Sequence, residues 1–382
     1  MLLAQQKFRV SVHGADALEK LDWPSTNDSG PFTSHVFQSR EFLTLWLETI
    51  GKARRSEPHF AVVSDSCGQP LMLLPLCVEH SLGFSVLRFM DGGVADYNAP
   101  IIRNGEYFKA SEFVGIWSQI LNAIGPIDAV DLRKIVSHIG SAPNPMLALK
   151  TIQQASSGYL IETSANDWDA FSKEKRRKKE LTKARRKLNQ LTKEGPVRFT
   201  IAETPDEART LWRATAAMKR TQYLETMGED FFEQPGIRAF YEGAISGERL
   251  NRLGVICARL RNDTVIAGHL GFRAKNRFHY ILPAYNRDYA GYGPGRQLLI
   301  DVIRWSFESG HEVLDLGEGD LDYKKVWSTK RLTLVSHGDA ITWSGRLYFL
   351  LKAAKSAPAL RRLYNRMKRA EASEPAPRKA QR

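Results

Sequence analysis

The segment Tyr285-Asn286-Arg287-Asp288-Tyr289-Ala290-Gly291-Tyr292-Gly293-Pro294-Gly295-Arg296-Gln297 joins an expected strand at residues 277–282 to an expected helix at residues 298–307. Closely spaced glycines allow a backbone to approach a ligand, and the amides at the start of a helix suit a pyrophosphate. The segment therefore predicts a diphosphate-binding loop. The alternative is a plain tight turn in which proline leads into the helix.

Two other phosphate-binding loops are excluded by the residues around these glycines. A P-loop requires Gly-Lys-Ser/Thr, which the segment lacks, and a dinucleotide-binding loop requires a βαβ unit. The strands expected before the segment instead form an antiparallel meander, at residues 253–260, 264–272 and 277–282.

A similar order of elements is expected in the first half of the chain. Alignment of Asp131 with Asp315, each followed by leucine and preceded by valine or leucine, brings the two halves into register. This indicates a diverged internal duplication. The predicted fold class is α/β (α+β), with two similar domains that each hold a mixed, largely antiparallel sheet flanked by helices. The elements expected in the first half are a helix within 35–50, strands at 59–64, 71–78 and 85–90, a helix at 112–124 and a strand at 127–132.

The composition is typical of a soluble globular protein, with 43% hydrophobic and 25% charged residues among 382. At roughly 100 to 200 residues per domain, the chain should hold about two domains. No apolar run reaches the ~18 to 20 residues of a spanning helix, and residues 1–10 lack the apolar core of a secretory signal, so we expect a cytoplasmic protein. The three cysteines form no Cys-x-x-Cys pair, so neither a disulfide framework nor a metal site is expected.

The formal net charge of +13 is concentrated in two segments, residues 173–194 and 352–382, which each carry a net charge of +8. An anionic partner would meet these segments. The first is expected to be a basic helix that binds tRNA, other nucleic acid, anionic lipid or an acidic face of the protein, or that is simply solvated. Residues 348–369 mix aromatic and leucine residues with Lys and Arg, which suits a membrane surface.

Five further motifs accompany the glycine segment. They are Asp315-Leu316-Gly317-Glu318-Gly319-Asp320, Tyr323-Lys324-Lys325-Val326-Trp327, Phe37-Gln38-Ser39, Leu74-Pro75-Leu76 and Asp96-Tyr97-Asn98-Ala99-Pro100. With these motifs the chain resembles, over about residues 35–335, GNAT-superfamily acyltransferases of the CelD type, a group labelled as involved in cellulose biosynthesis. The chain is more distantly similar to the Fem-type peptidoglycan aminoacyl transferases.

The resemblance implies tandem GNAT-like domains, with the acyl donor, acetyl-CoA or another acyl-CoA, bound by the second. The usual donor loop reads Arg/Gln-x-x-Gly-x-Gly/Ala, and Ala290 stands at its Arg/Gln position, a departure that Arg296 could offset. Residues 96–103 of the first half hold no glycine pair, so the donor is assigned to the second half. The expected donor-binding residues are Gly291, Gly293, Pro294, Gly295 and Arg296.

The reaction implied by the resemblance is attack of an amine, or less readily a hydroxyl, on a thioester. A lysine-like amine with a pKa of ~10.4 is almost fully protonated at pH 7, so the site needs a base, and the leaving thiolate needs a proton. Tyr323 is expected to supply that proton, and Lys324 to stabilise the developing negative charge. Glu318 and Asp320 are the candidate bases.

Several of these side chains have a structural alternative. Tyr323 could be a core contact beside Trp327, and Lys324 could be a solvated charge. His269 could be a buried strand histidine with satisfied hydrogen bonds, and Asp315 an acceptor in the turn after its strand. The candidates for substrate contact, by ring stacking or within a channel, are Tyr285, Tyr289, His269 and Asp315.

The sequence predicts acyl-CoA-dependent N-acyl transfer, by default acetyl transfer, to an unidentified small-molecule or cell-envelope amine or saccharide, in envelope or exopolysaccharide metabolism. The alternatives are a Fem-like aminoacyl transferase that uses charged tRNA, and a non-catalytic scaffold with a degenerate GNAT fold. The expected location is cytoplasmic, with peripheral contact at the inner face of the membrane. The predicted parts are 1–160, a GNAT-like domain without a donor loop; 161–195, a basic linker helix; 196–345, the GNAT acyltransferase domain; and 346–382, a basic helix and disordered tail.

Overall fold

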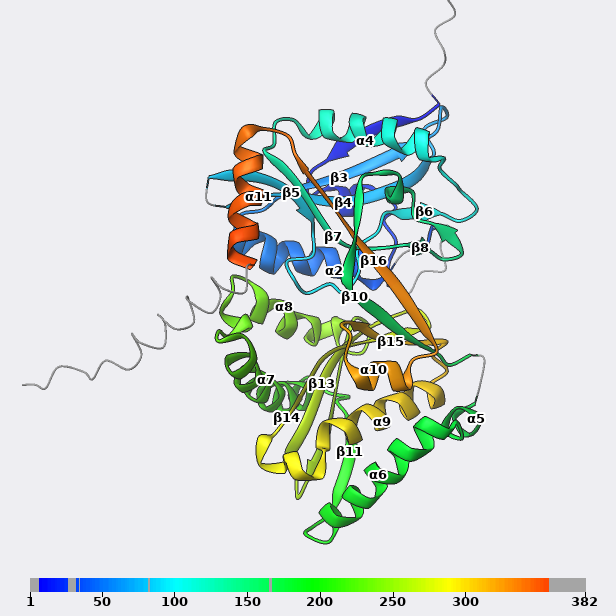
Figure 1. The fold of residues 1–382 in the computed structure, drawn as a ribbon, viewed down its shortest axis with the longest axis vertical. Helices are drawn as coiled ribbons and strands as arrows, with labels where there is room; N and C mark the ends of the chain where they lie inside the picture. Colours follow the sequence, from blue (N-terminus) through cyan, green and yellow to red (C-terminus); the bar gives the residue numbers. More distant parts are fainter. Residues whose placement is uncertain (1–6, 27–31, 34, 82, 165–166, 357–382) are drawn as a thin grey trace, which may run out of the picture.

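One 14-stranded mixed sheet runs through both halves of the molecule (Figure 1). The computed structural model describes residues 7–26, 32–33, 35–81, 83–164 and 167–356. Of the basic helix and disordered tail predicted at residues 346–382, residues 357–382 lie outside the described residues. Within the described ranges, no helix combines the length and the apolar character that crossing a membrane requires.

The first half contributes the strand order β1-β3-β4-β5-β7, with the short β2 and β6 at its margin. Its strands are β1 (Arg9–His13), β2 (Phe32–Thr33), β3 (Glu57–Ser64), β4 (Pro70–Ser81), β5 (Phe84–Phe89), β6 (Ile101–Arg103) and β7 (Ala129–Val136). Its α-helices are α1 (Ala17–Lys20), α2 (Arg40–Trp46), α3 (Lys52–Arg54) and α4 (Ala110–Ile124). A separate two-stranded sheet pairs β8 (His138–Ile139) with β9 (Ala142–Pro143).

The second half presents the same order in reverse across the sheet, β15-β14-β13-β12-β11. Its strands are β11 (Val197–Ile201), β12 (Gly254–Arg261), β13 (Thr264–Ala274), β14 (Arg277–Tyr285) and β15 (Val313–Glu318). Its α-helices are α5 (Trp168–Ser172), α6 (Lys175–Thr192), α7 (Pro205–Met227), α8 (Ile237–Ala244), α9 (Pro294–Glu308) and α10 (Asp322–Trp327). Helix α11 (Trp343–Ser356) follows the second half in sequence but packs beside β5 and β7 of the first half (Figure 1).

Two long strands are exchanged between the halves at the centre of the sheet. β10 (Thr151–Glu162) follows the first half in sequence but pairs with β15, whereas β16 (Lys330–Ala340) follows the second half but pairs with β7. The two strands also pair with each other. In both halves the last two strands of the motif, β5 with β7 and β14 with β15, are parallel, and the other ladders are antiparallel. The predicted internal duplication is therefore present as a repeated topology.

Alternate residues along the strands of the second half face two different cores. Ile256 belongs to the large core that also holds α7 residues and extends into the first half, whereas Val255 and Cys257 belong to a second core with α9. Since successive side chains of a strand point to opposite faces, α7 and α9 cover opposite faces of the sheet. The large core joins the halves through aromatic contacts such as Phe42 with Phe240, at 5.1 Å between ring centroids.

Local sequence signals set the helix starts. Ser39 caps α2 by accepting the Phe42 amide, as its position predicts, and Thr204 with Glu207 forms a capping box on α7. The expected helix at residues 298–307 begins earlier, at Pro294, because proline is well suited to the first position of a helix. Helices α7 and α8 were not among the elements expected from the sequence.

Candidate active site

A cavity of about 580 Å³ opens where β14 and β15 separate. The two strands pair only through Arg277–His279 and Val313–Asp315, and a bulge at Ile281 bends β14 further. Segments from both halves of the chain meet here. The polar and loop residues that line the cavity include Asp96, Lys187, Lys219, Gln222, Tyr285, Ala290, Tyr292, Gly293, Pro294, Gly295, Arg296, Glu318, Tyr323 and Lys324.

The glycine segment lines one end of the cavity. Gly293 caps α9 in the left-handed conformation, with φ of 65° and ψ of 49°, and Pro294 occupies the first turn. The first amides of a helix have no intrahelical acceptor, and the helix dipole gives that end a partial positive charge. Because Pro294 has no N–H, the amides of Gly295 and Arg296 are the first that α9 offers to an anion in the cavity.

The basic helix α6 forms a wall beside this end. Lys187 and Ala184 line the cavity, and a Cβ atom at Gly293 would lie 3.6 Å from the Lys187 side chain. The carboxylate of Glu180, on the same helix, forms an ion pair with the Arg296 guanidinium at 3.1 Å. This part of the basic segment therefore contributes positive charge to the same end of the cavity as the α9 amides.

The other end of the cavity brings together the predicted catalytic residues Glu318, Tyr323 and Lys324. Burial raises the pKa of Tyr323 to about 12, and the negative charge of Asp96 adds to the shift. Lys324 is only 6% exposed, and its ammonium group donates to the carbonyl oxygen of Glu318. Burial lowers the pKa of Lys324, while Asp96 and other carboxylates oppose that shift. The alternative of a solvated Lys324 is therefore wrong.

Asp96 reaches the cavity from the first half of the chain. Burial raises the pKa of its carboxyl group, while Lys134 and Lys324 oppose the shift, and the carboxylate accepts the backbone amide of Glu318. Gly317 makes this approach possible. Its φ is +73°, and a Cβ atom there would lie 2.2 Å from Asp96 Oδ2.

Gly317→Ala is expected to destabilise the folded protein by about 2 to 4 kcal/mol, because it adds backbone strain and a clash with the Asp96 carboxylate. Gly105→Ala is the matched control, since φ there is +84° but no atom lies within 4 Å of the added Cβ. The control should lose only about 1 to 2 kcal/mol. Chemical unfolding of the two variants measures the difference, and equal losses would contradict the close approach of Asp96.

Lys219 of α7 lies at the same end of the cavity. Its ammonium group donates to the carbonyl oxygen of Pro283 at 3.1 Å. Burial lowers its pKa to about 8, and the positive charge of Lys324 adds to the shift. Lys219 was not among the residues predicted from the sequence because its helix was not expected, and no role was predicted for Asp96. The Asp-Tyr-Asn-Ala-Pro motif around Asp96 was the available signal.

Lys219→Met is expected to stabilise the protein at neutral pH while lowering its activity. The pKa of Lys219 is lower in the folded state, about 8, than in the unfolded state, near 10.5, so the unfolded chain binds more protons between these values. The buried charge therefore destabilises the fold below pH 8, and this effect fades as the pH rises towards 10.5. The full shift corresponds to about 3 kcal/mol, which partial solvent exposure reduces to about 1 to 2 kcal/mol.

Unfolding free energies of wild type and Lys219→Met at pH 7 and pH 10 test this prediction. The variant should be the more stable at pH 7 by about 1 to 2 kcal/mol, and the difference should shrink at pH 10. A variant that is less stable than wild type at pH 7 would contradict the destabilising role of the buried ammonium group.

Five of the predicted site residues do not line this cavity. Gly291 is exposed, Tyr289 contacts Arg261, and Asp320 accepts the hydroxyl of Tyr159. His269 is fully buried, stacks on Tyr280 at 4.0 Å and accepts the bulge amide of Ile281 at 3.0 Å. Burial lowers the pKa of His269 well below its usual value, so this histidine is neutral.

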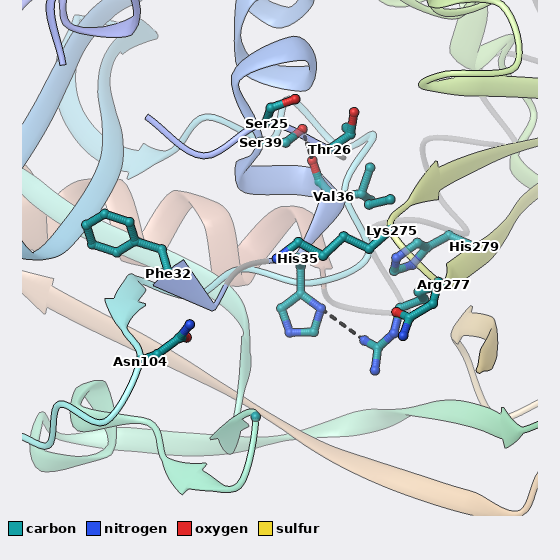
Figure 2. A pocket seen from close by; sticks show the side chains of 13 residues that line it. Ser25, Thr26, Phe32, His35, Val36, Ser39, Asn104, Lys275, Arg277 and His279 are labelled. Carbon is teal, nitrogen blue, oxygen red and sulfur yellow. Dashed lines mark hydrogen bonds between the residues drawn. The ribbon is translucent and has the colours of Figure 1, made fainter. Parts of the chain in front are cut away.

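Asp315, the fifth, is fully buried between this cavity and another. Its Oδ1 accepts the Tyr97 hydroxyl and the Gly317 amide, both at 2.8 Å. Burial raises its pKa to about 6, against the effect of nearby Arg277. The other cavity, of about 300 Å³, is lined by Arg277, His35 and His279, and Figure 2 shows Arg277 donating to His35. Asp315 thus ties β15 to the first half of the chain through Tyr97.

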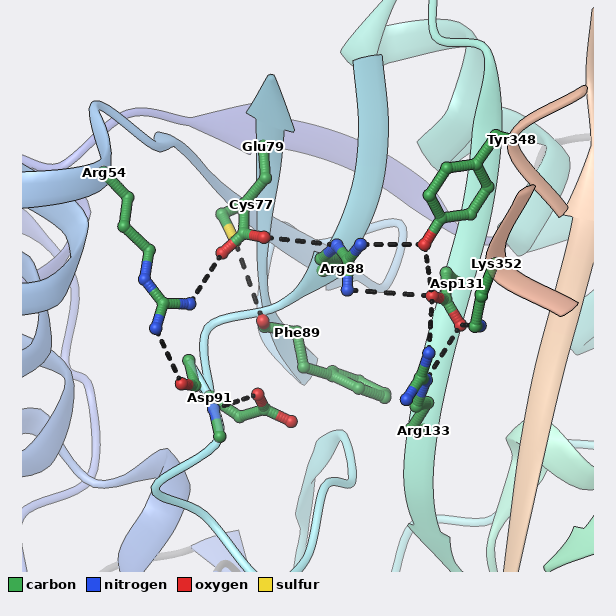
Figure 3. A network of polar contacts seen from close by, with 12 residues as sticks. Arg54, Cys77, Glu79, Arg88, Phe89, Asp91, Asp131, Arg133, Tyr348 and Lys352 are labelled. Atoms are coloured by element: carbon green, nitrogen blue, oxygen red, sulfur yellow. Dashed lines mark hydrogen bonds and ion pairs between the residues drawn. The ribbon is translucent and has the colours of Figure 1, made fainter. Parts of the chain in front are cut away.

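In the first half, charged side chains surround the position that corresponds to Asp315 (Figure 3). Asp131, the counterpart of Asp315, is surrounded by Arg88, Arg133 and Lys352 at 2.7 to 3.6 Å. The cavity beside it measures about 220 Å³. Helix α4 follows Lys109 and has no glycine pair at its start. This half therefore offers much less room for a diphosphate.

Comparisons with known proteins agree with this architecture. Residues 175–325 match the family model described as the acetyltransferase (GNAT) domain. No curated protein matches the chain. Among solved structures, FemX is 12% identical with a TM-score of 0.54, covering 84% of this chain and 95% of FemX. A conserved protein of unknown function from Bacteroides thetaiotaomicron VPI-5482 is 13% identical with a TM-score of 0.51, covering 84% and 96%.

A tandem GNAT protein from the clavulanic acid biosynthesis pathway is 10% identical with a TM-score of 0.47, covering 87% of this chain and 98% of that protein. The family match covers every residue that lines the cavity except Asp96. The repeated topology gives the first half the same element order. The chain therefore has the GNAT fold in two halves of repeated topology, and residues 175–325 match the acetyltransferase (GNAT) domain.

Proposed function

We propose that this protein is an acyl-CoA-dependent N-acyltransferase, with acetyl-CoA as the default donor. The observation that carries the proposal is the single cavity that joins the start of α9 to Tyr323, Lys324 and Asp96. One end of the cavity suits a diphosphate and the other holds groups that can transfer protons. This is the arrangement that transfer from a diphosphate-bearing thioester requires.

The donor diphosphate would lie against the amides of Gly295 and Arg296, with Arg296 and Lys187 adding positive charge. The pantetheine arm would then follow the opening between β14 and β15. Ile281, Pro283 and Leu316 line that opening and supply apolar contacts. The thioester would end near Tyr323.

The acceptor amine would attack the thioester carbonyl from the side of Asp96. A protonated acceptor must first lose one proton to solvent, because only the neutral amine can attack. As the C–N bond forms, Asp96 takes the next proton of the amine, and its raised pKa makes it a stronger base than an ordinary carboxylate. Lys219 and Lys324 would stabilise the negative charge on the carbonyl oxygen. As the C–S bond breaks, Tyr323 gives its proton to the thiolate, and solvent returns the proton from Asp96 to Tyr323.

The acceptor is an unidentified primary amine. Asp96 and Glu318 place negative charge at its end of the cavity, which favours a cationic acceptor. The resemblance to the CelD type supports an acceptor from envelope or exopolysaccharide metabolism. Glu318 is the alternative base, but Lys134 and Ser156 already engage its two oxygens.

Aminoacyl transfer from charged tRNA is the second candidate. The observation that favours it is the position of α6, a helix rich in Lys and Arg, at the wall of the cavity. A polyanionic donor would gain affinity from such a wall, and that affinity would fall steeply with salt.

Release of free CoA thiol from acetyl-CoA and longer acyl-CoAs, in the presence of a panel of primary amines, tests the proposal. We expect thiol release that depends on both the acyl-CoA and the amine. Transfer from aminoacyl-tRNA without binding of any acyl-CoA would favour the second candidate instead. Binding of acyl-CoA without turnover on any amine or hydroxyl acceptor would favour a non-catalytic role.

A further inference from the structure

Helix α11 turns apolar side chains towards solvent. Four of them recur at the spacing of one helical face: Trp343, which is 81% exposed, Leu347, Leu350, which is 67% exposed, and Leu351. Ile341 precedes them and is also exposed. We name these five side chains the apolar stripe. Such a face is normally the one that a helix buries.

The opposite face of α11 is attached to the protein by polar contacts. The Tyr348 hydroxyl donates to Asp131 Oδ2 at 2.7 Å and accepts from Arg88 at 2.8 Å, while Lys352 donates to Asp131 Oδ1 at 2.7 Å (Figure 3). Gly345 packs so closely that a Cβ atom there would lie 2.0 Å from the carbonyl oxygen of Asp128. These contacts fix the rotation of the helix, so the apolar stripe cannot turn inward without breaking them.

Positive charge accompanies the apolar stripe. The guanidinium of Arg346 lies 4.2 Å from the centroid of the Trp343 ring. Residues 341–354 contain no Asp or Glu, and residues 352–382 carry a net charge of +8. An exposed apolar face on a helix that carries cations and no acidic residues is the pattern of a helix that lies in the interface of an anionic bilayer.

We propose that α11 docks this protein on an anionic membrane surface, with the apolar stripe in the interface and the basic residues against lipid headgroups. The alternative occupants are disfavoured by charge. A second copy would bring another segment of net charge +8 to the same place, and the segment 357–382 of the same chain would bring cations to a helix without acidic residues. An anionic bilayer would instead neutralise the positive charge of α11 and of the segment that follows it. The proposal does not depend on the reaction catalysed at the cavity.

Flotation of the full-length protein with lipid vesicles tests this. We expect binding to phosphatidylcholine vesicles that contain about 30% phosphatidylglycerol, little binding to phosphatidylcholine alone, and weaker binding at high salt. The double variant Leu347→Glu/Leu350→Glu should bind the anionic vesicles at least about tenfold more weakly. Its matched control is Ile152→Glu/Leu224→Glu, which adds the same charge at exposed apolar residues elsewhere and should bind as wild type does.

Four results would overturn the proposal. Absence of wild-type binding to anionic vesicles, or equal binding by wild type and Leu347→Glu/Leu350→Glu, would show that the apolar stripe does not dock on lipid. Stronger vesicle binding by a chain truncated after Ser356 would identify residues 357–382 as the cover of the stripe. A wild-type dimer that dissociates in Leu347→Glu/Leu350→Glu, without vesicle binding, would identify a second copy instead.

Discussion

Tyr323→Phe is expected to lower kcat for acyl transfer by about 100- to 1,000-fold, while the Kd for acyl-CoA stays within about twofold of wild type. The substitution removes only the hydroxyl group, so the packing of the ring against the core of the second half is retained. A thiolate would then leave without a proton donor beside it. A pKa of about 12 keeps Tyr323 protonated at neutral pH, which is the state that a proton donor requires.

Tyr285→Phe is the matched control. Tyr285 lines the same cavity, but at the end formed by the glycine segment, and its hydroxyl accepts from Arg287. Loss of that hydroxyl should change kcat by less than about threefold. Initial rates of thiol release, with the Kd for acyl-CoA measured separately, compare the two variants. A Tyr323→Phe enzyme that keeps more than about a fifth of wild-type kcat would rule out the assigned proton donor.

Asp96→Asn is the second large effect, with an expected loss of about 100-fold or more in kcat. An amide has the same shape as the carboxylate and can still accept the Glu318 amide, but it cannot take the proton of the amine. The carboxylate must be ionised to act, so wild-type activity should fall as the pH drops through the raised pKa of Asp96. The variant should lack this acidic limb.

Asp320→Asn provides the comparison for Asp96. Asp320 was predicted as a base from the sequence, but its carboxylate accepts the Tyr159 hydroxyl and does not line the cavity. Its loss should reduce kcat by less than about threefold. If Asp320→Asn lost more activity than Asp96→Asn, the base would belong to β15 and its loop rather than to the first half of the chain.

The parts of the site that the sequence predicts are those encoded by local pattern. Gly293 and Gly295 meet the cavity because a strand, a glycine pair and a helix follow one another directly. Tyr323 and Lys324 reach it because they follow β15 by only a few residues. In each case the short stretch of chain between the residue and the neighbouring strand or helix limits where its side chain can lie.

The rest of the site depends on contacts between distant segments. Lys219 lies on α7, and it enters the cavity only because α7 packs across β13 and β14. Asp96 lies in a loop of the other half, whose approach depends on a glycine at position 317. The motif around Asp96 marks that residue as a candidate, but no local pattern shows that Asp96 or Lys219 reaches the cavity.

The exchange of β10 and β16 could not be predicted for the same reason. Each strand joins the sheet of the half to which it does not belong in sequence, with partners such as Leu160 with Asp315 and Gly338 with Asp131. Strand periodicity predicts that a segment forms a strand, but not which edge it joins. His269 is a similar case. The strand that contains it was predicted from the sequence, but the burial of its side chain against the Tyr280 ring depends on how the sheet packs.

The most direct test of the central claim is calorimetric titration of wild type, Gly295→Glu and Gly291→Glu with acetyl-CoA. The carboxylate of Gly295→Glu would stand beside the first amides of α9, whereas Gly291 is exposed and has no atom within 4 Å of an added Cβ. We predict that wild type and Gly291→Glu bind with similar Kd and that Gly295→Glu binds at least about tenfold more weakly. Equal binding by all three proteins, or no binding by wild type at millimolar acetyl-CoA, would contradict a donor site at the start of α9.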